Sequence, residues 1–257
     1  MSRFSTASQP AGLDPASLFT TKFVDGKMSI NADAKTRTLN PITTGTSVIG
    51  VKFDGGVAIA SDMLGSYGSL ARYPGISRMV KINDTTVLGA SGDIADLQAL
   101  KEELESMMIA NKIEDDGHEY SPEAIFSFLR MLMYHRRNKF DPLWNILVVA
   151  GYNNETPFLG YIDKIGSAYV DDSITTGYGS HMARPLIRKA LDTEGAKLSK
   201  VDAVKLLIDC MKILYYRDAR AINKFEIAVV TNEGVVVETN MEADTNWEIA
   251  HMIKGYE

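Results

Sequence analysis

T-T-G-T-S-V-I-G-V-K-F-D-G-G-V-A-I-A-S-D, residues 43–62, consists of two β-branched, apolar runs separated by Asp54-Gly55-Gly56. An Asp-Gly-Gly step between two such runs predicts a β-hairpin. The pair Gly45-Thr46 stands at the head of the first strand, and Asp62 ends the second. A threonine hydroxyl is a poor nucleophile at neutral pH, but it becomes useful when its own freed α-amine acts as the base. Because this requires cleavage just before the threonine, the segment raises the question whether Thr46 is a working nucleophile.

Composition excludes several classes of protein. The chain has 257 residues, of which 45% are hydrophobic, enough for one sizeable core or two small ones. Its net charge of −6 and pI of about 5.3 give no electrostatic footprint for nucleic acid or an anionic membrane. Cys210 is the single cysteine, so a disulfide framework is excluded and a reducing compartment fits. The four histidines are too scattered for metal-ligand spacing, and we expect neither a metal nor a cofactor.

The first 37 residues differ from the rest of the chain. Small and polar residues dominate there, and no apolar stretch follows Arg3, which argues against a secretory signal. Ser, Thr and Arg raise a transit-peptide interpretation, but three aspartates weigh against it. Two hypotheses remain for residues 1–37, a flexible tail or a removable pro-segment, and the Gly-Thr junction downstream favours the pro-segment. Residues 38–257 show no linker, so we predict a single domain there.

The order of predicted elements indicates the fold class. Strands are predicted at 46–53, 57–61, 79–83, 86–91, 145–152, 158–163, 167–170, 225–230 and 235–238. Helices are predicted around 97–108, from Ser121, over about 180–191, from Ser199, and as a short segment from about Asn246. Hairpins separated by helix pairs are typical of two antiparallel sheets packed face to face with helices outside, an α+β sandwich.

Several motifs resemble those of proteasome β subunits. Within residues 43–93 they are Gly45-Thr46, F-D-G-G-V, Ser61-Asp62 and S-G-D; further on, Y-Y-R-D-A occupies 215–219. More specific matches are D-M-L-G-S-Y-G-S-L-A-R at 62–72, D-P-L-W-N at 141–145, Y-Y-R-D-A-R at 215–220 and the closing N-W-E-I-A-H-M-I-K-G-Y-E. The resemblance covers almost the whole chain from Thr38. It implies the four-layer αββα fold of the N-terminal-nucleophile hydrolases, and a place in a seven-membered β ring of the 20S core, in cytoplasm and nucleus.

The same resemblance implies which residues correspond to a catalytic site. Thr46 matches the nucleophile, and Asp62 and Asp218 match the two aspartates of active family members. Arg78 stands where those members carry a lysine, and Ala221 where they carry a serine. We place a further family serine before the middle strand, where residues 142–145 are P-L-W-N and offer none. The threonine and both aspartates are therefore present, while the lysine and both serines are absent.

Arginine does not replace lysine in this role. The family lysine is a compact charge whose pKa can fall on burial, whereas arginine stays protonated and needs room for a planar fork. We therefore predict no catalytic residues, only vestigial ones, with Asp62 and Asp218 structural: paired with backbone N–H groups, Arg78 or Arg217. The alternative is an active threonine endopeptidase that uses Thr46 with Arg78 in place of lysine. An unrelated self-cleaving N-terminal-nucleophile hydrolase is a third hypothesis.

Processing and partners are also implied by the resemblance. If the chain is not cut before Thr46, the Thr46 nitrogen stays an amide and cannot act as a base. The resemblance implies trimming further upstream, near Thr38, by an active neighbour in the ring. The expected partners are two β neighbours, α-ring subunits and β subunits of the opposite ring, all serving assembly of a particle for ubiquitin-dependent protein degradation.

Overall fold

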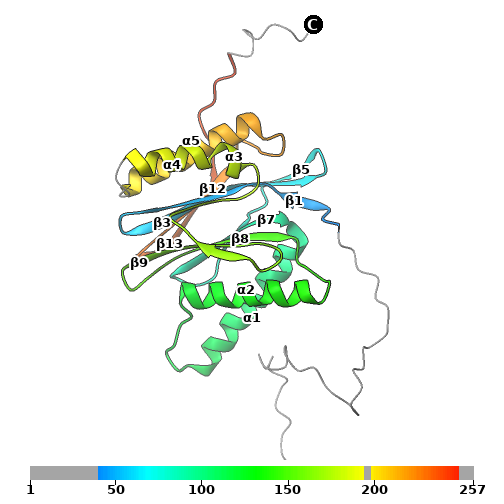
Figure 1. The fold of residues 1–257 in the computed structure, drawn as a ribbon, viewed down its shortest axis with the longest axis vertical. Helices are drawn as coiled ribbons and strands as arrows, with labels where there is room; N and C mark the ends of the chain where they lie inside the picture. The colour runs from blue at the N-terminus through cyan, green and yellow to red at the C-terminus, as the bar shows by residue number, and fades with distance from the viewer. Residues whose placement is uncertain (1–39, 194–197, 249–257) are drawn as a thin grey trace, which may run out of the picture. The chain divides into compact units, whose positions relative to one another are not determined.

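Two antiparallel sheets lie face to face in this protein, with helices on both outer faces (Figure 1). The structure is a computed structural model that describes residues 40–193 and 198–248. The four-layer α+β sandwich expected from the sequence is therefore confirmed. The pro-segment predicted at residues 1–37 lies outside the described residues, and so does most of the short helix predicted from about Asn246.

The larger sheet has eight strands, seven of them in the order β10-β9-β8-β7-β1-β4-β5, with β6 also pairing with β7. The strands are β1 (Thr43–Gly45), β4 (Leu64–Tyr67), β5 (Leu70–Pro74), β6 (Met79–Lys81), β7 (Thr86–Asp93), β8 (Asn145–Asn153), β9 (Thr156–Ile162) and β10 (Ala168–Val170). Every pairing in this sheet is antiparallel. The three-residue strand β1 is thus the link between the β7 side of the sheet and the β4–β5 hairpin.

The smaller sheet has five strands in the order β11-β2-β3-β12-β13. They are β2 (Val48–Phe53), β3 (Gly56–Asp62), β11 (Ser173–Thr175), β12 (Phe225–Thr231) and β13 (Gly234–Met241). The predicted hairpin is confirmed as β2–β3, paired from Val48 opposite Ser61 to Phe53 opposite Gly56. Gly55 in its turn has φ +82°, a conformation that glycine adopts without steric cost.

The helices are α1 (Ile94–Glu114), α2 (Pro122–Asn138), α3 (Gly179–Met182), α4 (Arg184–Thr193) and α5 (Lys200–Arg217). Their side-chain caps follow the sequence, because Ser121 and Ser199 each accept a hydrogen bond from a first-turn N–H. The prediction of a single helix over 180–191 is wrong in one respect, because the structure has two helices there, α3 and α4, separated at Ala183. Pro185 explains the division, because its nitrogen has no hydrogen to donate to the preceding turn. None of the described helices is both long and apolar enough to cross a membrane.

Three apolar clusters hold the layers together. The cluster between the sheets includes Val48 and Ile59 from one sheet with Val148 and Leu159 from the other. The α5 face packs on the smaller sheet and the α1–α2 pair on the larger, each through a separate cluster. Along β8 the side chains alternate, so that Val148 faces the other sheet while its neighbours face the helices.

Four short strands were missed by the sequence analysis: β1, β4, β5 and β11. Residues 64–74 show no apolar alternation, and all of β5 is exposed. Thr46 was expected to begin a strand, whereas β2 begins at Val48. These strands are only three to five residues long and exist because a neighbouring strand supplies the ladder, which periodicity within one segment does not reveal.

Cys210 is expected to resist alkylation in the folded chain. It is fully buried in the cluster under α5, and this burial raises the pKa of its thiol to about 12. At pH 8 roughly one thiol in 10⁴ is then ionised, and the thiolate is the reactive form. Mass spectrometry should find no iodoacetamide adduct on the native chain and one adduct after unfolding in guanidinium. Stoichiometric labelling of the native chain would contradict the buried position.

Candidate functional site

Thr46 lies where the chain passes from one sheet to the other. Gly45 ends β1 in the larger sheet, opposite Gly92, and Val48 begins β2 in the smaller one. The two residues between them form the crossover, and Thr46 is half-buried there. In the continuous chain its nitrogen is the amide that joins it to Gly45. An amide nitrogen is not basic, so in the uncut chain no α-amine activates the hydroxyl.

The Thr46 hydroxyl is hydrogen-bonded to Asp218, a contact that the sequence analysis did not predict, since it paired Asp218 with backbone N–H groups, Arg78 or Arg217. Thr46 Oγ1 donates a hydrogen bond to Asp218 Oδ2 at 2.5 Å, across 172 positions of sequence. Asp218 follows the last residue of α5, and its other oxygen accepts the Arg220 N–H at 2.9 Å. Ala221, where a serine was expected in active relatives, contributes only its backbone N–H to the Asp218 carbonyl. Asp218 therefore ties the end of α5 to the crossover.

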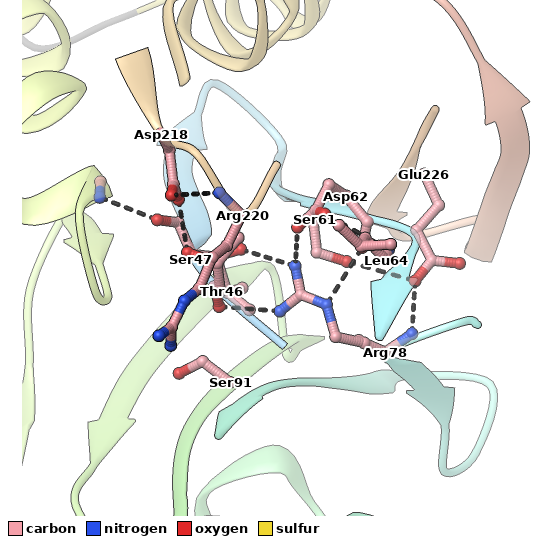
Figure 2. A network of polar contacts seen from close by, with 12 residues as sticks. Thr46, Ser47, Ser61, Asp62, Leu64, Arg78, Ser91, Asp218, Arg220 and Glu226 are labelled. Atoms are coloured by element: carbon pink, nitrogen blue, oxygen red, sulfur yellow. Dashed lines mark hydrogen bonds and ion pairs between the residues drawn. The ribbon is translucent and has the colours of Figure 1, made fainter. Parts of the chain in front are cut away.

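Arg78 lies at the centre of the site and is completely buried (Figure 2). A guanidinium carries five N–H donors, and all five have an acceptor here. Nε donates to the Asp62 carbonyl at 3.0 Å, Nη1 to the Thr46 and Ala90 carbonyls at 2.9 Å, and Nη2 to the Ser47 carbonyl at 2.9 Å and to Asp62 Oδ1. These contacts join the crossover to β3 and β7. Arg78 thus bonds the backbone of Thr46, while the hydroxyl faces Asp218.

Asp62 is the counter-ion of Arg78. Both side chains are almost fully buried and they form an ion pair. Burial raises the pKa of the Asp62 carboxyl above its ordinary value, and the Arg78 charge opposes that shift. Asp62 Oδ2 accepts the Leu64 N–H at 3.3 Å. Because arginine stays protonated, an ionised Asp62 is what keeps its buried charge neutralised.

Arg78 also accounts for the glycine at position 45. A Cβ built on Gly45 would lie 2.2 Å from Arg78 Cδ and 2.8 Å from Nε. Both distances are far inside van der Waals contact, so a side chain at position 45 would displace the guanidinium. The glycine that marks a cleavage junction by sequence is here required by packing.

Asp93 holds the chain just upstream of this junction. Its Oδ1 caps α1 by accepting the Ala95 N–H at 2.8 Å, and its Oδ2 accepts the Ile42 N–H at 3.0 Å. Within β1, Thr44 pairs with Ser66 on one side and Asp93 on the other. The residues before Thr46 are therefore built into the sheet.

Glu226 is a site residue that sequence reasoning missed. It lies on β12, is fully buried, and accepts four hydrogen bonds. Its donors are the Ser61 and Ser77 hydroxyls and the backbone N–H groups of Arg78 and Met79, at 2.7–3.2 Å. A carboxylate within an otherwise apolar strand, F-E-I-A-V-V, was the available signal. It fixes the backbone that carries Arg78.

A second missed element is the loop after β11. Its sequence is T-T-G-Y-G-S at 175–180, a run of small and polar residues directly after a strand. Thr176 Oγ1 accepts the Val48 N–H at 2.7 Å, and the Gly179 N–H donates to Ser47 Oγ at 2.9 Å. Asn145, at the end of the segment where the further family serine was placed, lies on β8 opposite Gly92. The loop 175–180, rather than residues 142–145, bonds directly to the crossover.

The part of the chain that the structure describes contains no candidate metal-binding site. Among these residues no group of three or more His, Cys, Asp and Glu side chains could hold a metal ion. The site instead consists of a buried cation, carboxylates and hydroxyls that bond within the chain: Arg78; Asp62, Asp93, Asp218 and Glu226; and Thr46, Ser47, Ser61, Ser77 and Thr176. Its geometry locks the crossover in place.

Comparison with known proteins points to one family. The family described as "Proteasome subunit" matches residues 42–230. Proteasome subunit beta type-4 of Xenopus laevis is 56% identical over 220 residues, 86% of this chain and 90% of that protein. The protein of the same name from Dictyostelium discoideum is 46% identical over 211 residues, 82% of this chain and 81% of its own length. Proteasome subunit beta type-7 of Saccharomyces cerevisiae is 41% identical over 234 residues, 88% of both chains. The resemblance carried by the sequence motifs is thus confirmed, including its narrower form, the beta type-4 group.

Proposed function

This chain belongs to the proteasome subunit family, and we propose that it is a non-catalytic, structural β subunit of the 20S core particle. Its role is to support ring assembly for ubiquitin-dependent protein degradation. The proposal rests mainly on the hydrogen bonds of Arg78. All five of its N–H groups donate to oxygens other than the Thr46 hydroxyl. The residue in the lysine position thus has no donor left for the nucleophile.

Two further observations support the same proposal. The residues before Thr46 form β1, which pairs with β7 on one side and β4 on the other. The Thr46 hydroxyl donates to Asp218, so its proton is held by a carboxylate, which is a weak base compared with an amine. Residues that act as one catalytic unit fail together when some are lost. The alternative of a threonine endopeptidase using Arg78 has no specific observation in its favour.

The proposal includes partners, processing and location. The chain would contact β neighbours in its ring, α-ring subunits and β subunits of the opposite ring, without nucleic acid, membrane or cofactor. Trimming would occur near Thr38, so that Thr46 stays internal, and the particle would work in cytoplasm and nucleus. Family membership supports the presence of proteasome partners, and the position of β1 within the sheet supports the internal position of Thr46.

An epoxyketone probe tests the absence of activity directly. The probe needs both the threonine hydroxyl and a free α-amine, so we expect no adduct on this chain in the intact particle. N-terminal sequencing of the same sample should show a start upstream of Thr46, near Thr38. A mature start at Thr46, or an adduct on this chain while other subunits serve as labelled controls, would overturn the proposal.

Replacing Thr46 by alanine is expected to leave peptide hydrolysis by the particle unchanged. The substitution removes one hydrogen bond to Asp218, so the free energy of unfolding should fall by about 1 kcal/mol. Fluorogenic peptide assays on purified particles and urea unfolding of the chain measure the two effects. Thr156→Ala, at the exposed first residue of β9, is the matched control and should change neither quantity. Loss of one peptidase activity in Thr46→Ala particles would contradict the structural role.

A further inference from the structure

The C-terminal end of α2 exposes an aromatic side chain in a strained backbone conformation. Phe140 is 86% exposed and has φ +53°, in the left-handed region that favours glycine. The backbone there is held in place, because the Phe140 N–H donates to the Arg137 carbonyl and the Asp141 N–H to the Arg136 carbonyl, both at 3.1 Å. Glycine is the usual residue at such a helix end. A phenylalanine that is costly here and almost fully exposed points to a contact outside this chain.

Two further apolar side chains are exposed on α2 and on the turn that packs against it. Tyr134 on α2 is 45% exposed, and Ile165 in the β9–β10 turn is 44% exposed. The turn packs on the helix, because a Cβ on Gly166 would lie 2.7 Å from the Cβ of Tyr134. The Arg137 guanidinium lies over the Tyr134 ring at 5.6 Å. We use the name α2-end face for the exposed residues of this helix end and of the turn packed on the helix: Tyr134, Arg137, Lys139, Phe140 and Ile165.

The α2-end face is basic in a chain of net charge −6. Arg137 and Lys139 are exposed on the last turn of α2 and just after it, and Arg130 is exposed two turns earlier. The nearby Asp163 carboxylate accepts the N–H groups of Ile165 and Ser167 at 2.8–2.9 Å. An exposed aromatic side chain close in sequence to an exposed arginine has the composition of an interface hot spot. The complementary surface is an apolar socket with an acidic rim.

We propose that the α2-end face docks on another subunit of the particle, inserting Phe140 into an apolar socket rimmed by aspartate and glutamate. The inference rests on the proposed function, which supplies the partners. A second copy of this chain is the competing occupant. Charge complementarity favours a subunit with an acidic rim, and the proposed place in the particle puts other subunits beside this chain.

Phe140→Gly separates docking from folding. Glycine adopts positive φ freely, so the melting temperature of the purified variant should equal or exceed that of the wild type. Its incorporation into particles, scored by quantitative mass spectrometry against other subunits, should fall by about tenfold, as for a hot-spot aromatic. Asn154→Gly, also at an exposed positive-φ position, is the backbone-matched control and should incorporate normally. Normal incorporation of Phe140→Gly would overturn the inference.

Charge reversal tests the acidic rim. Arg137→Glu with Lys139→Glu should lower incorporation, whereas the control pair Lys200→Glu with Lys205→Glu on α5 should not. Equal incorporation of the two double variants into particles would contradict the proposal that the partner surface is acidic. Sedimentation of the isolated chain should show a monomer, and a dimer abolished by Phe140→Gly would replace the subunit by a second copy. Failure of the wild-type chain to enter particles would instead remove the proposed function and the inference together.

Discussion

Replacing Arg78 by alanine is expected to destabilise the chain by about 3–5 kcal/mol or more, because it leaves Asp62 as an unpaired buried charge. The substitution also removes hydrogen bonds from the carbonyls of Thr46 and Ser47 in the crossover and of Ala90 on β7. The free energy of unfolding of a typical domain is only about 5–15 kcal/mol, so this loss would remove a large part of the stability of the chain. Urea unfolding of the purified chain and its soluble yield measure the loss.

Two variants show whether the network or merely a positive charge is responsible. Arg78→Lys keeps the charge but has three donors in place of five, so we expect an intermediate loss of about 2 kcal/mol. Lys81→Ala breaks an exposed ion pair with Asp84 and should cost less than about 0.5 kcal/mol. An Arg78→Ala chain as stable as Lys81→Ala would show that Arg78 does not lock the crossover.

Replacing Glu226 by alanine should have the second-largest effect, a loss of about 4 kcal/mol in the free energy of unfolding. Four buried donors lose their acceptor at once: two serine hydroxyls and the N–H groups of Arg78 and Met79. Denaturant titration followed by circular dichroism measures the change.

Glu226→Gln is the informative companion. The glutamine oxygen can keep the three donors that now reach Oε1, and its amide can donate to the Ser77 hydroxyl in reverse of the present bond. We therefore expect a loss of about 1 kcal/mol. Glu233→Ala, on the exposed β12–β13 turn, is the control for removing a carboxylate and should be neutral. A glutamine variant as unstable as the alanine variant would mean that the charge of Glu226 matters more than its hydrogen bonds.

The larger elements were predictable because their signals are local. The β2–β3 hairpin follows from Asp54-Gly55-Gly56 between apolar runs, and α2 and α5 follow from a capping serine before a helical stripe. The division between α3 and α4 was missed although Pro185 was visible. The strands β1, β4 and β5 were not predictable from periodicity, since their ladders depend on partners elsewhere in the chain.

Most residues of the candidate site could be predicted from the sequence, but the contacts between them could not. The family resemblance implied that Thr46, Asp62, Arg78 and Asp218 belong to one site, and the structure brings them together. Sequence spacing did not reveal that Arg78 bonds the Thr46 carbonyl while Asp218 takes the hydroxyl. Glu226 was missed because its role depends on Ser77 and Arg78, about 150 positions away.

Sequence alone established the sandwich of sheets and helices, the family resemblance and the exchange of lysine for Arg78, since each depends on residue identity at fixed spacing. The effect of having Arg78 in the position of the family lysine became clear only from the contacts that Arg78 makes in the folded chain. A guanidinium is saturated only when five acceptors converge on one point, and these come from β3, β7 and the crossover at Thr46. Gly45 shows the same difference: it marks a cleavage junction in the sequence, and in the folded chain it makes room for Arg78.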